Sequence, residues 1–343
     1  MQTFQKSRIR AVKNLMTSLF EKITEAHHGL RPRVLTTPLE YSSALSRLTG
    51  CEVYLKCEHL QRTGSFKFRG ASNKLRLLSP SQREKGVVTA SSGNHGLAMA
   101  MAARSLGTEV EVYVPEHASP AKTEAIRLLG AKLVHVPGDA LAAELTALHQ
   151  AGLGNKAYVP PYNDSEVIAG QGTIAMEMLE QENNFDAVFV SVGGGGMISG
   201  IGTAFRARSP RTEIVGCWPA NAPSMHASLA AGRIVEIVET DTISDGTAGG
   251  IEPDAVTFRI CQQVIDHCAL VTETEIRNAM RLLAASERWM VEGAAGVAMA
   301  GMLQNASRYQ GQRVAIVLCG RNISLEKYLE VLTQAPDLYS QQR

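Results

Sequence analysis

One lysine in the sequence has neighbours that suit it to covalent chemistry. Lys67 stands between Phe66 and Phe68 in the segment TGSFKFRG, whose small residues allow a ligand to approach closely. Burial beside aromatic rings disfavours the charged ammonium and lowers the pKa of a lysine. A neutral amine can then attack a carbonyl carbon and form a Schiff base. The ordinary alternative is a solvated lysine, and other motifs in the chain are needed to distinguish the two interpretations.

A glycine loop over residues 193–196 provides a second candidate site, between a β-rich run and a helical one that begins near Met197. Backbone N–H groups at the start of a helix can bind a phosphate. A dinucleotide fingerprint fails, because Ser199 stands where its third glycine belongs and no carboxylate ends the next strand. The loop therefore favours a single phosphate monoester, with tight turn packing as the alternative.

The segment SSGNHG supplies polar groups at another turn between a strand and a helix. Ser91 and Ser92 offer hydroxyl groups, and Asn94 offers an amide beside the N–H groups of the following helix. This set suits a carboxylate and an aromatic hydroxyl. Helix capping is the structural alternative, and His95 taken alone is expected to be structural.

Cys319 is a further candidate because it follows a predicted buried strand, residues 314–318. Ligands bind at the carboxyl ends of strands in open α/β sheets, and the segment CGRN lies at such an end. A neutral thiol bonds a ring nitrogen only weakly, whereas a carboxylate would hold that nitrogen protonated. An inert buried cysteine is the alternative.

The composition favours small-molecule chemistry. The chain has 343 residues, 45% of them apolar, and its 34 basic and 33 acidic residues give no general attraction for nucleic acid. The six cysteines form no CxxC pair and no ligand spacing with the nine histidines, so we expect no metal site and no disulfides. Residues 1–26 do not read as a secretion signal, and no apolar run of about 20 residues occurs to span a bilayer. We expect a cytoplasmic protein.

Strand-like and helical stretches alternate along most of the chain, which predicts parallel sheets with crossover helices. Apolar residues at helical spacing predict a first helix over residues 11–26. The expected strands are 53–56, 87–90, 110–114, 133–136, 187–192, 214–218 and 314–318. The later expected helices are 97–106, 121–129, 140–149, 197–207 and 275–289.

The expected fold is α/β, with two open, twisted parallel-sheet domains and flanking helices. Strand 53–56 precedes the first series of elements, so the first unit is expected to be inserted into the second. Boundaries are placed near residue 60 and near residue 160, where two prolines break local structure. Residues 61–159 then form a small inserted domain, and residues 1–60 with 160–343 form a large cofactor-binding domain.

Taken together, these motifs resemble a known family. TGSFKFRGA, SSGNHG, GQGTIAMEM, SVGGGGMISG, Asp245-Gly246 and CGRN are similar, in this order, to motifs of the fold type II pyridoxal-phosphate enzymes, specifically the threonine/serine dehydratase and serine racemase group. The resemblance runs from about residue 37 to residue 322. It implies a fold like that of tryptophan synthase β, pyridoxal 5′-phosphate as the cofactor and an amino acid as the substrate.

The resemblance also assigns roles to individual residues. It implies that Lys67 holds the cofactor as a Schiff base, that Asn94 contacts the ring hydroxyl and that Cys319 faces the ring nitrogen. The cofactor-binding residues it implies are Lys67, Phe66, Asn94, Gly193, Gly194, Gly195, Gly196, Met197 and Cys319. The substrate-binding residues are Ser91, Ser92, His95, Gln171 with Gly170, Asp245 and Gly246. The catalytic residues are Lys67, Ser92 and Glu292.

The implied reaction removes water from a 3-hydroxy amino acid and releases a 2-oxo acid and ammonia. Lys67 would take the Cα proton, and the cofactor phosphate or Glu292 would protonate the departing hydroxide; an ion-paired or solvated glutamate is the alternative for Glu292. A neutral Cys319 would favour elimination over transamination. Ser92 matches the serine with which racemases protonate the opposite face of Cα, so a serine-type racemase is the main alternative. A nicotinamide-dependent oxidoreductase is disfavoured by the failed fingerprint, and a non-catalytic amino-acid sensor would have little need for such a lysine.

The chain departs from the family pattern in some places. Residues 218–224 read WPANAPS where some relatives carry acidic metal ligands, so no cation is expected. The chain ends at residue 343, which leaves no room for the regulatory domain of long threonine dehydratases. Residues 245–253 and CGRN are similar to dehydratases of hydroxyectoine utilisation, whose substrate would be a 3-hydroxy-2,4-diamino acid or a derivative. Threonine, serine, 3-hydroxyaspartate and phenylserine stay open as substrates, and a homodimer or homotetramer is expected.

Overall fold

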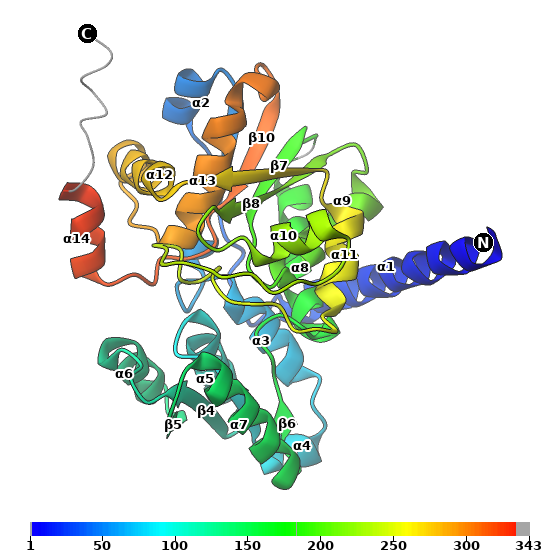
Figure 1. Ribbon diagram of the computed structural model, residues 1–343, viewed down its shortest axis with the longest axis vertical. Helices are drawn as coiled ribbons and strands as arrows, with labels where there is room; N and C mark the ends of the chain where they lie inside the picture. Colours follow the sequence, from blue (N-terminus) through cyan, green and yellow to red (C-terminus); the bar gives the residue numbers. More distant parts are fainter. Residues whose placement is uncertain (1, 183, 334–343) are drawn as a thin grey trace.

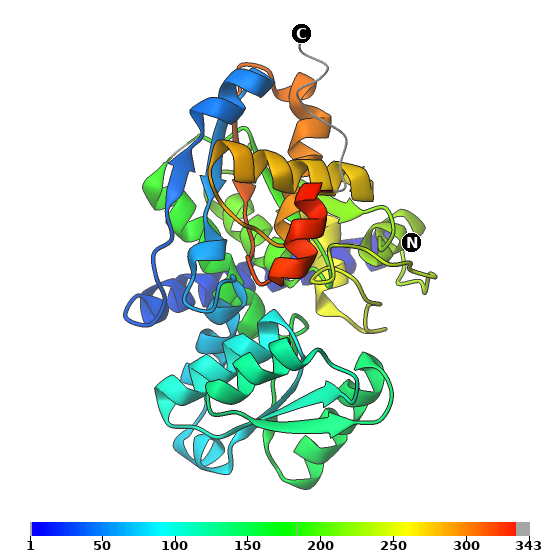
Figure 2. The ribbon, with the colours of Figure 1, turned by 90° about the vertical axis from the view of Figure 1, so that its left-hand side faces the viewer.

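The computed structural model describes residues 2–182 and 184–333, which form two β-sheets covered by helices. Figure 1 shows the four-stranded sheet below the six-stranded one, and Figure 2 shows the same two halves after a quarter turn. Neighbouring strands run parallel except in the pair β1–β2. The expected α/β class with two open parallel sheets is confirmed.

The six-stranded sheet has the order β1-β2-β10-β7-β8-β9. Its strands are β1 (Leu39–Tyr41), β2 (Glu52–Lys56), β7 (Ala187–Ser191), β8 (Glu213–Pro219), β9 (His267–Val271) and β10 (Arg313–Val317). All five residues of β7 are buried, as in a parallel strand that is covered on both faces. Neither the antiparallel edge strand β1 nor β9 is among the strands expected from the sequence. β10 lies in the interior of the sheet, between β2 and β7.

The four-stranded sheet has the order β5-β4-β3-β6. Its strands are β3 (Val87–Ala90), β4 (Val110–Pro115), β5 (Lys132–Val136) and β6 (Ala157–Tyr158). The chain forms β1 and β2 of the larger sheet before these strands and returns to that sheet afterwards. The limits of an inserted domain at residues 61 and 159 stay a prediction.

Helices cover both sheets. α1 (Gln2–Leu30) is longer than expected. α12 (Glu273–Ser286) begins earlier than expected, at a capping box in which the side chains of Thr272 and Glu275 accept each other's backbone N–H. The other α-helices are α2 (Ser43–Thr49), α3 (Lys67–Arg76), α4 (Pro80–Lys85), α5 (Asn94–Leu106), α6 (Pro120–Leu128), α7 (Ala140–Leu153), α8 (Ser165–Gln181), α9 (Gly196–Arg208), α10 (Ser224–Ala231), α11 (Val256–Val264), α13 (Gly293–Asn305) and α14 (Leu325–Thr333). Short 3₁₀ helices are η1 (Glu58–Leu60) and η2 (Ala306–Tyr309). Within the two described ranges, no helix is long and apolar enough to cross a membrane.

Helix α8, which was not among the expected helices, packs closely against both α3 and α9. A Cβ atom added to Gly170 of α8 would lie 2.6 Å from the Cα atom of Gly70 in α3. A Cβ atom added to Gly200 of α9 would lie 2.5 Å from the backbone nitrogen of Gly172. Glycine is required at these contacts because the helix backbones touch. Since α3 begins at the candidate lysine and α9 at the glycine loop, α8 fixes their relative positions.

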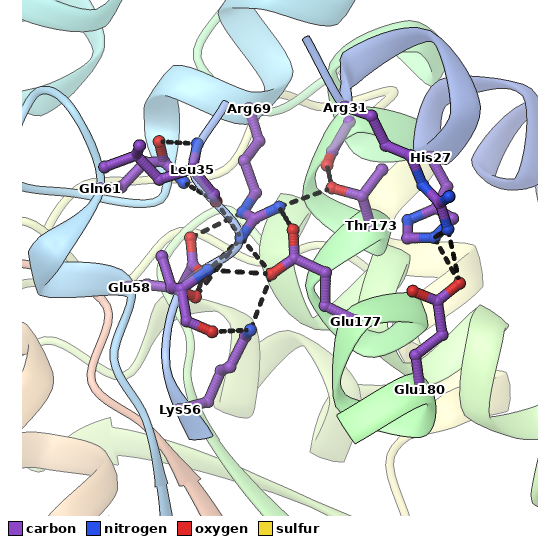
Figure 3. A network of polar contacts seen from close by, with 12 residues as sticks. His27, Arg31, Leu35, Lys56, Glu58, Gln61, Arg69, Thr173, Glu177 and Glu180 are labelled. Atoms are coloured by element: carbon purple, nitrogen blue, oxygen red, sulfur yellow. Dashed lines mark hydrogen bonds and ion pairs between the residues drawn. The ribbon is translucent and has the colours of Figure 1, made fainter. Parts of the chain in front are cut away.

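A buried cluster of four ions supports the same helices (Figure 3). The Arg69 guanidinium donates to Glu58 at 2.7 Å and to Glu177 at 2.6 Å, and the Lys56 ammonium donates to Glu177 at 2.7 Å. Burial alone would lower the pKa of Arg69, but the two carboxylates raise it above its usual value. Two positive and two negative charges balance, so β2, η1, α3 and α8 are joined without net buried charge.

Candidate active site

Lys67 is positioned by two segments that pair just beyond the carboxyl end of β10. The backbone N–H of Phe66 donates to the carbonyl of Cys319 at 3.0 Å, and the N–H of Arg321 donates to the carbonyl of Gly64 at 2.9 Å. Helix α3 begins directly after this pairing, so its first side chain, Lys67, starts beside the turn that follows β10. Strand β10 therefore determines where the lysine lies.

The Lys67 amine lies in a partly buried position. Its Nζ donates to the carbonyl of Pro161 at 2.8 Å and lies 5.3 Å from the centroid of the Phe66 ring. Burial lowers the pKa of Lys67 to about 8, and the nearby Cys319 and Glu292 oppose the shift. The lowered pKa expected from the sequence is confirmed. The expectation that both aromatic neighbours flank the amine is wrong, because Phe68 is buried in a hydrophobic cluster with residues of the four-stranded sheet.

The glycine loop 193–196 connects β7 to α9, as expected. Gly195 has φ +84°, which favours glycine, and the loop ends at the first turn of α9, whose N–H groups have no partner within the helix. A Cβ atom on Gly194 would lie 2.5 Å from the Tyr162 ring, and one on Gly193 would lie 3.0 Å from the Cα atom of Thr247. The Met197 side chain is buried in the core, so its contribution to ligand binding is limited to its backbone.

Tyr162 was missed in the sequence, where the segment PPYND indicates only a break. Its ring covers Gly194, and its hydroxyl accepts the backbone N–H of Glu252 at 3.1 Å. The preceding residue, Pro161, accepts the hydrogen bond from Lys67. One short segment thus contacts both the amine and the glycine loop, which places both groups next to residues 161 and 162.

Asn94, the first residue of α5, is hydrogen-bonded to the turn that follows β10. Its amide nitrogen donates to both carboxylate oxygens of Glu292, at 2.9 and 3.0 Å, and its amide oxygen accepts from Nδ2 of Asn322 at 2.6 Å. The backbone N–H of Asn322 also donates to Glu292, at 3.0 Å. This triangle joins the four-stranded sheet to the turn after β10. Asn322 belongs to the CGRN motif, but no role was predicted for it.

Cys319 lies beside Glu292, one member of this triangle, and close to Lys67. The Cys319 sulfur lies 4.0 Å from Oε1 of Glu292 and accepts from the Ser191 hydroxyl at 3.6 Å. Burial raises the pKa of Cys319, and the Glu292 charge raises it further, so the thiol stays neutral at physiological pH. The neutral thiol expected from the sequence is confirmed. Glu292 is 4% exposed at the start of α13.

The other site residues predicted from the sequence differ in how deeply they are buried. His95 is buried, its Nε2 lies 3.1 Å from the Val159 carbonyl, and burial together with the Lys67 charge lowers its pKa to about 3. Gln171 lies in the middle of α8, where its amide oxygen accepts the N–H of Gly70 at 3.1 Å. Ser91 and Ser92 are half-buried on the turn before α5. Asp245 and Gly246 are exposed, and a Cβ on Gly246 would lie 3.6 Å from Glu292.

The donor set fits a pyridoxal phosphate. Lys67 offers an amine that loses its proton near neutral pH, the loop at α9 offers N–H groups to a phosphate, and the Tyr162 ring packs against that loop. Cys319 places a neutral group close to the amine. Among the residues that the structure describes, no three His, Cys, Asp or Glu side chains gather as metal ligands. Fold and site thus define a two-sheet α/β enzyme with a reactive lysine beside a phosphate-sized loop.

Comparison with known proteins identifies the family. The chain belongs to the pyridoxal-phosphate dependent enzymes, whose family pattern matches residues 30–320. It is 40% identical over 308 residues to the L-threonine ammonia-lyase of Thermotoga maritima, covering 89% of this chain and 76% of that one. It is 34% identical to the serine racemase of Arabidopsis thaliana, with 88% and 92% covered.

A solved structure is similar as well. The processed form of threonine deaminase isoform 2 from Solanum lycopersicum aligns with a TM-score of 0.88 and 33% identity, over 93% of this chain and 92% of that one. The resemblance to the dehydratase and racemase group is therefore confirmed, as are the fold and the pyridoxal-phosphate cofactor. The nicotinamide-dependent alternative is set aside.

Proposed function

We propose that the protein is a dehydratase that removes water from a 3-hydroxy amino acid and releases a 2-oxo acid and ammonia. The observation that carries this proposal is the position of the Lys67 amine beside the buried, neutral thiol of Cys319. The bound cofactor supplies an electron sink for charge that develops at the substrate Cα. A neutral thiol does not keep the ring nitrogen protonated, which favours loss of the β-hydroxyl over transamination.

Each protein group has a task in this reaction. Lys67, once displaced by the substrate amine, takes the Cα proton, and a pKa of about 8 leaves a useful neutral fraction at pH 7 to 8. Glu292 is our candidate for relaying a proton to the departing hydroxide from its place between Asn94 and Cys319: its carboxylate would first take up the proton that Lys67 removed from Cα and then give it up. Asn322 orients Asn94 by donating a hydrogen bond to the Asn94 amide oxygen. The exposed pair Asp245-Gly246 borders the substrate side near Glu292.

The test is a keto-acid release screen with the purified, cofactor-loaded enzyme. Threonine, serine, 3-hydroxyaspartate, phenylserine and a 3-hydroxy-2,4-diamino acid of the hydroxyectoine type form the panel. Equal amounts of 2-oxo acid and ammonia from one of them support the proposal. Lys67→Ala should abolish both the visible absorbance of the bound cofactor and the release, while the exposed Lys85→Ala should retain them. A fully active Lys67→Ala enzyme would refute the role of the lysine.

A racemase is the second candidate, and Ser92 favours it. Its hydroxyl lies on the turn before α5, where it is half-buried beside Asn94. Incubation with one enantiomer of serine, followed by chiral chromatography and keto-acid measurement, separates the two activities. Ser92→Ala should abolish any racemisation and leave elimination in place. We also propose that the protein is cytoplasmic and forms a homodimer or homotetramer. Light scattering of the purified protein tests the oligomeric state.

A further inference from the structure

A second pocket lies outside the candidate active site. Its volume is about 640 Å³, which is typical of sites that hold small molecules. It is bounded by the turn after α1, the loop before α3, and the helices α3 and α5. None of the glycine-loop residues lines it. The residues that line it include Arg33, Arg62 and Arg104 and the apolar Phe68 and Met101.

The charge of this arginine pocket is unbalanced. No aspartate or glutamate lines it. In the part of the chain that the structure describes, no ion pair joins the three arginines to a carboxylate. Instead, Nε of Arg62 donates to the Arg33 carbonyl at 2.8 Å, and Nη2 of Arg104 lies 3.7 Å from the Met101 sulfur. Three positive charges that share a concave surface attract an anion, and arginine forks match the oxygens of a phosphate.

Ser72 provides an independent sign of a ligand. It lines the arginine pocket from α3 and is only 3% exposed. Its hydroxyl has no hydrogen-bond partner among the described residues. Buried hydroxyl groups in proteins are nearly always hydrogen-bonded, so an unpaired one at a pocket wall calls for a partner from outside the chain.

We propose that the arginine pocket binds a small phosphorylated metabolite. The phosphate dianion lies between the guanidinium groups of Arg33, Arg62 and Arg104, and the organic part packs against Phe68 and Met101. The Ser72 hydroxyl donates to the bound anion. The ligand contacts both α3 and α5, the helices that begin at Lys67 and Asn94, so the site lies behind the catalytic residues and not among them.

Calorimetric titration of the cofactor-loaded enzyme tests this proposal, because the loaded glycine loop cannot take up phosphate. The probes are phenyl phosphate, inorganic phosphate and benzyl alcohol at constant ionic strength. Phenyl phosphate should bind one site per chain and more tightly than inorganic phosphate, whereas benzyl alcohol should not bind. Absence of binding by both phosphates at about 10 mM overturns the proposal.

Variants locate the binding. Arg33→Gln with Arg104→Gln should weaken phenyl phosphate binding at least about tenfold, because each removes a charged donor. The matched control is Arg47→Gln with Arg211→Gln, which removes two exposed arginines and should leave the affinity unchanged. Equal affinities of the two double variants overturn the proposal. If the pocket variant fails to fold, Ser72→Ala replaces it and should weaken binding several-fold, with unchanged affinity counting against the site.

Discussion

Glu177→Gln is the substitution that most directly tests the buried ion cluster of Figure 3. The Glu177 carboxylate accepts from Arg69 at 2.6 Å and from Lys56 at 2.7 Å, and glutamine keeps its size but not its charge. The variant leaves two buried cations with the single carboxylate of Glu58. Removal of one partner from a buried ion pair costs about 3–5 kcal/mol. At about 2–4 °C per kcal/mol, the thermal midpoint should fall by about 6–20 °C.

Differential scanning fluorimetry at pH 7 measures the effect, with Glu180→Gln as the matched control. Glu180 lies one turn further along α8, and its carboxylate binds His27 and Arg31 at 2.8 and 3.0 Å near the surface. Because its side chain is 53% exposed, its loss should cost less than about 1 kcal/mol. A Glu177→Gln protein as stable as the Glu180→Gln protein would refute our account of the cluster.

The same substitution predicts a pH dependence. Burial alone would raise the pKa of Glu177, but Arg69 and Lys56 lower it below its usual value. A carboxylate with a lowered native pKa stabilises the fold above the unfolded pKa of about 4.3 and loses this effect as pH falls through the native pKa. The difference in stability between wild type and Glu177→Gln should therefore be complete at pH 7 and shrink below about pH 4. A constant difference down to acidic pH would contradict the charge argument.

Three further predictions concern the active site. The first concerns the rate at which cofactor-free protein binds pyridoxal phosphate, measured by visible absorbance. This rate should rise with pH through about pH 8 and then level, because the neutral Lys67 amine is the reacting form. A rate that continues to rise to about pH 10, as for an ordinary lysine, would contradict the lowered pKa. Gly194→Ala should weaken cofactor binding at least about tenfold, because the added methyl group clashes with the Tyr162 ring. The control Gly152→Ala should leave the affinity unchanged, because its methyl group would meet nothing within 4 Å. Equal affinities of the two variants in a fluorescence titration would argue against the tight loop. Cys319→Asp should increase transamination relative to elimination in product analysis, and unchanged partitioning removes the electronic role of the thiol.

The sequence predicted the parts of the site that depend on local order. The glycine loop and the turn before α5 each join a strand to the next helix, so hydrophobic runs and glycine spacing were enough to find them. The buried strand before Cys319 was found in the same way. Each of these features can be predicted from residues that are close together in the sequence.

The missed parts depend on contacts between distant segments. Tyr162 reaches the glycine loop from a segment whose prolines indicate only a break, and Asn322 meets Asn94 across 228 positions. The ion cluster joins Lys56 and Glu177 across 121 positions. No local spacing indicates such pairs, because the side chains come together only when both sheets and α8 have packed. The antiparallel strand β1 was missed because it is only three residues long.

The interior position of β10 has a consequence for how the enzyme is made. β10 is the last strand among the described residues, yet it separates β2 from β7 and supplies the turn that pairs with residues 64–66. During synthesis on the ribosome, β2 and β7 must each wait with one side unpaired until residues 313–317 emerge. Such late, long-range pairing is slow and leaves strand edges open to aggregation. The reactive lysine is thus positioned only after residues 313–321 have emerged, so a growing chain that lacks them has no finished site with which to bind cofactor.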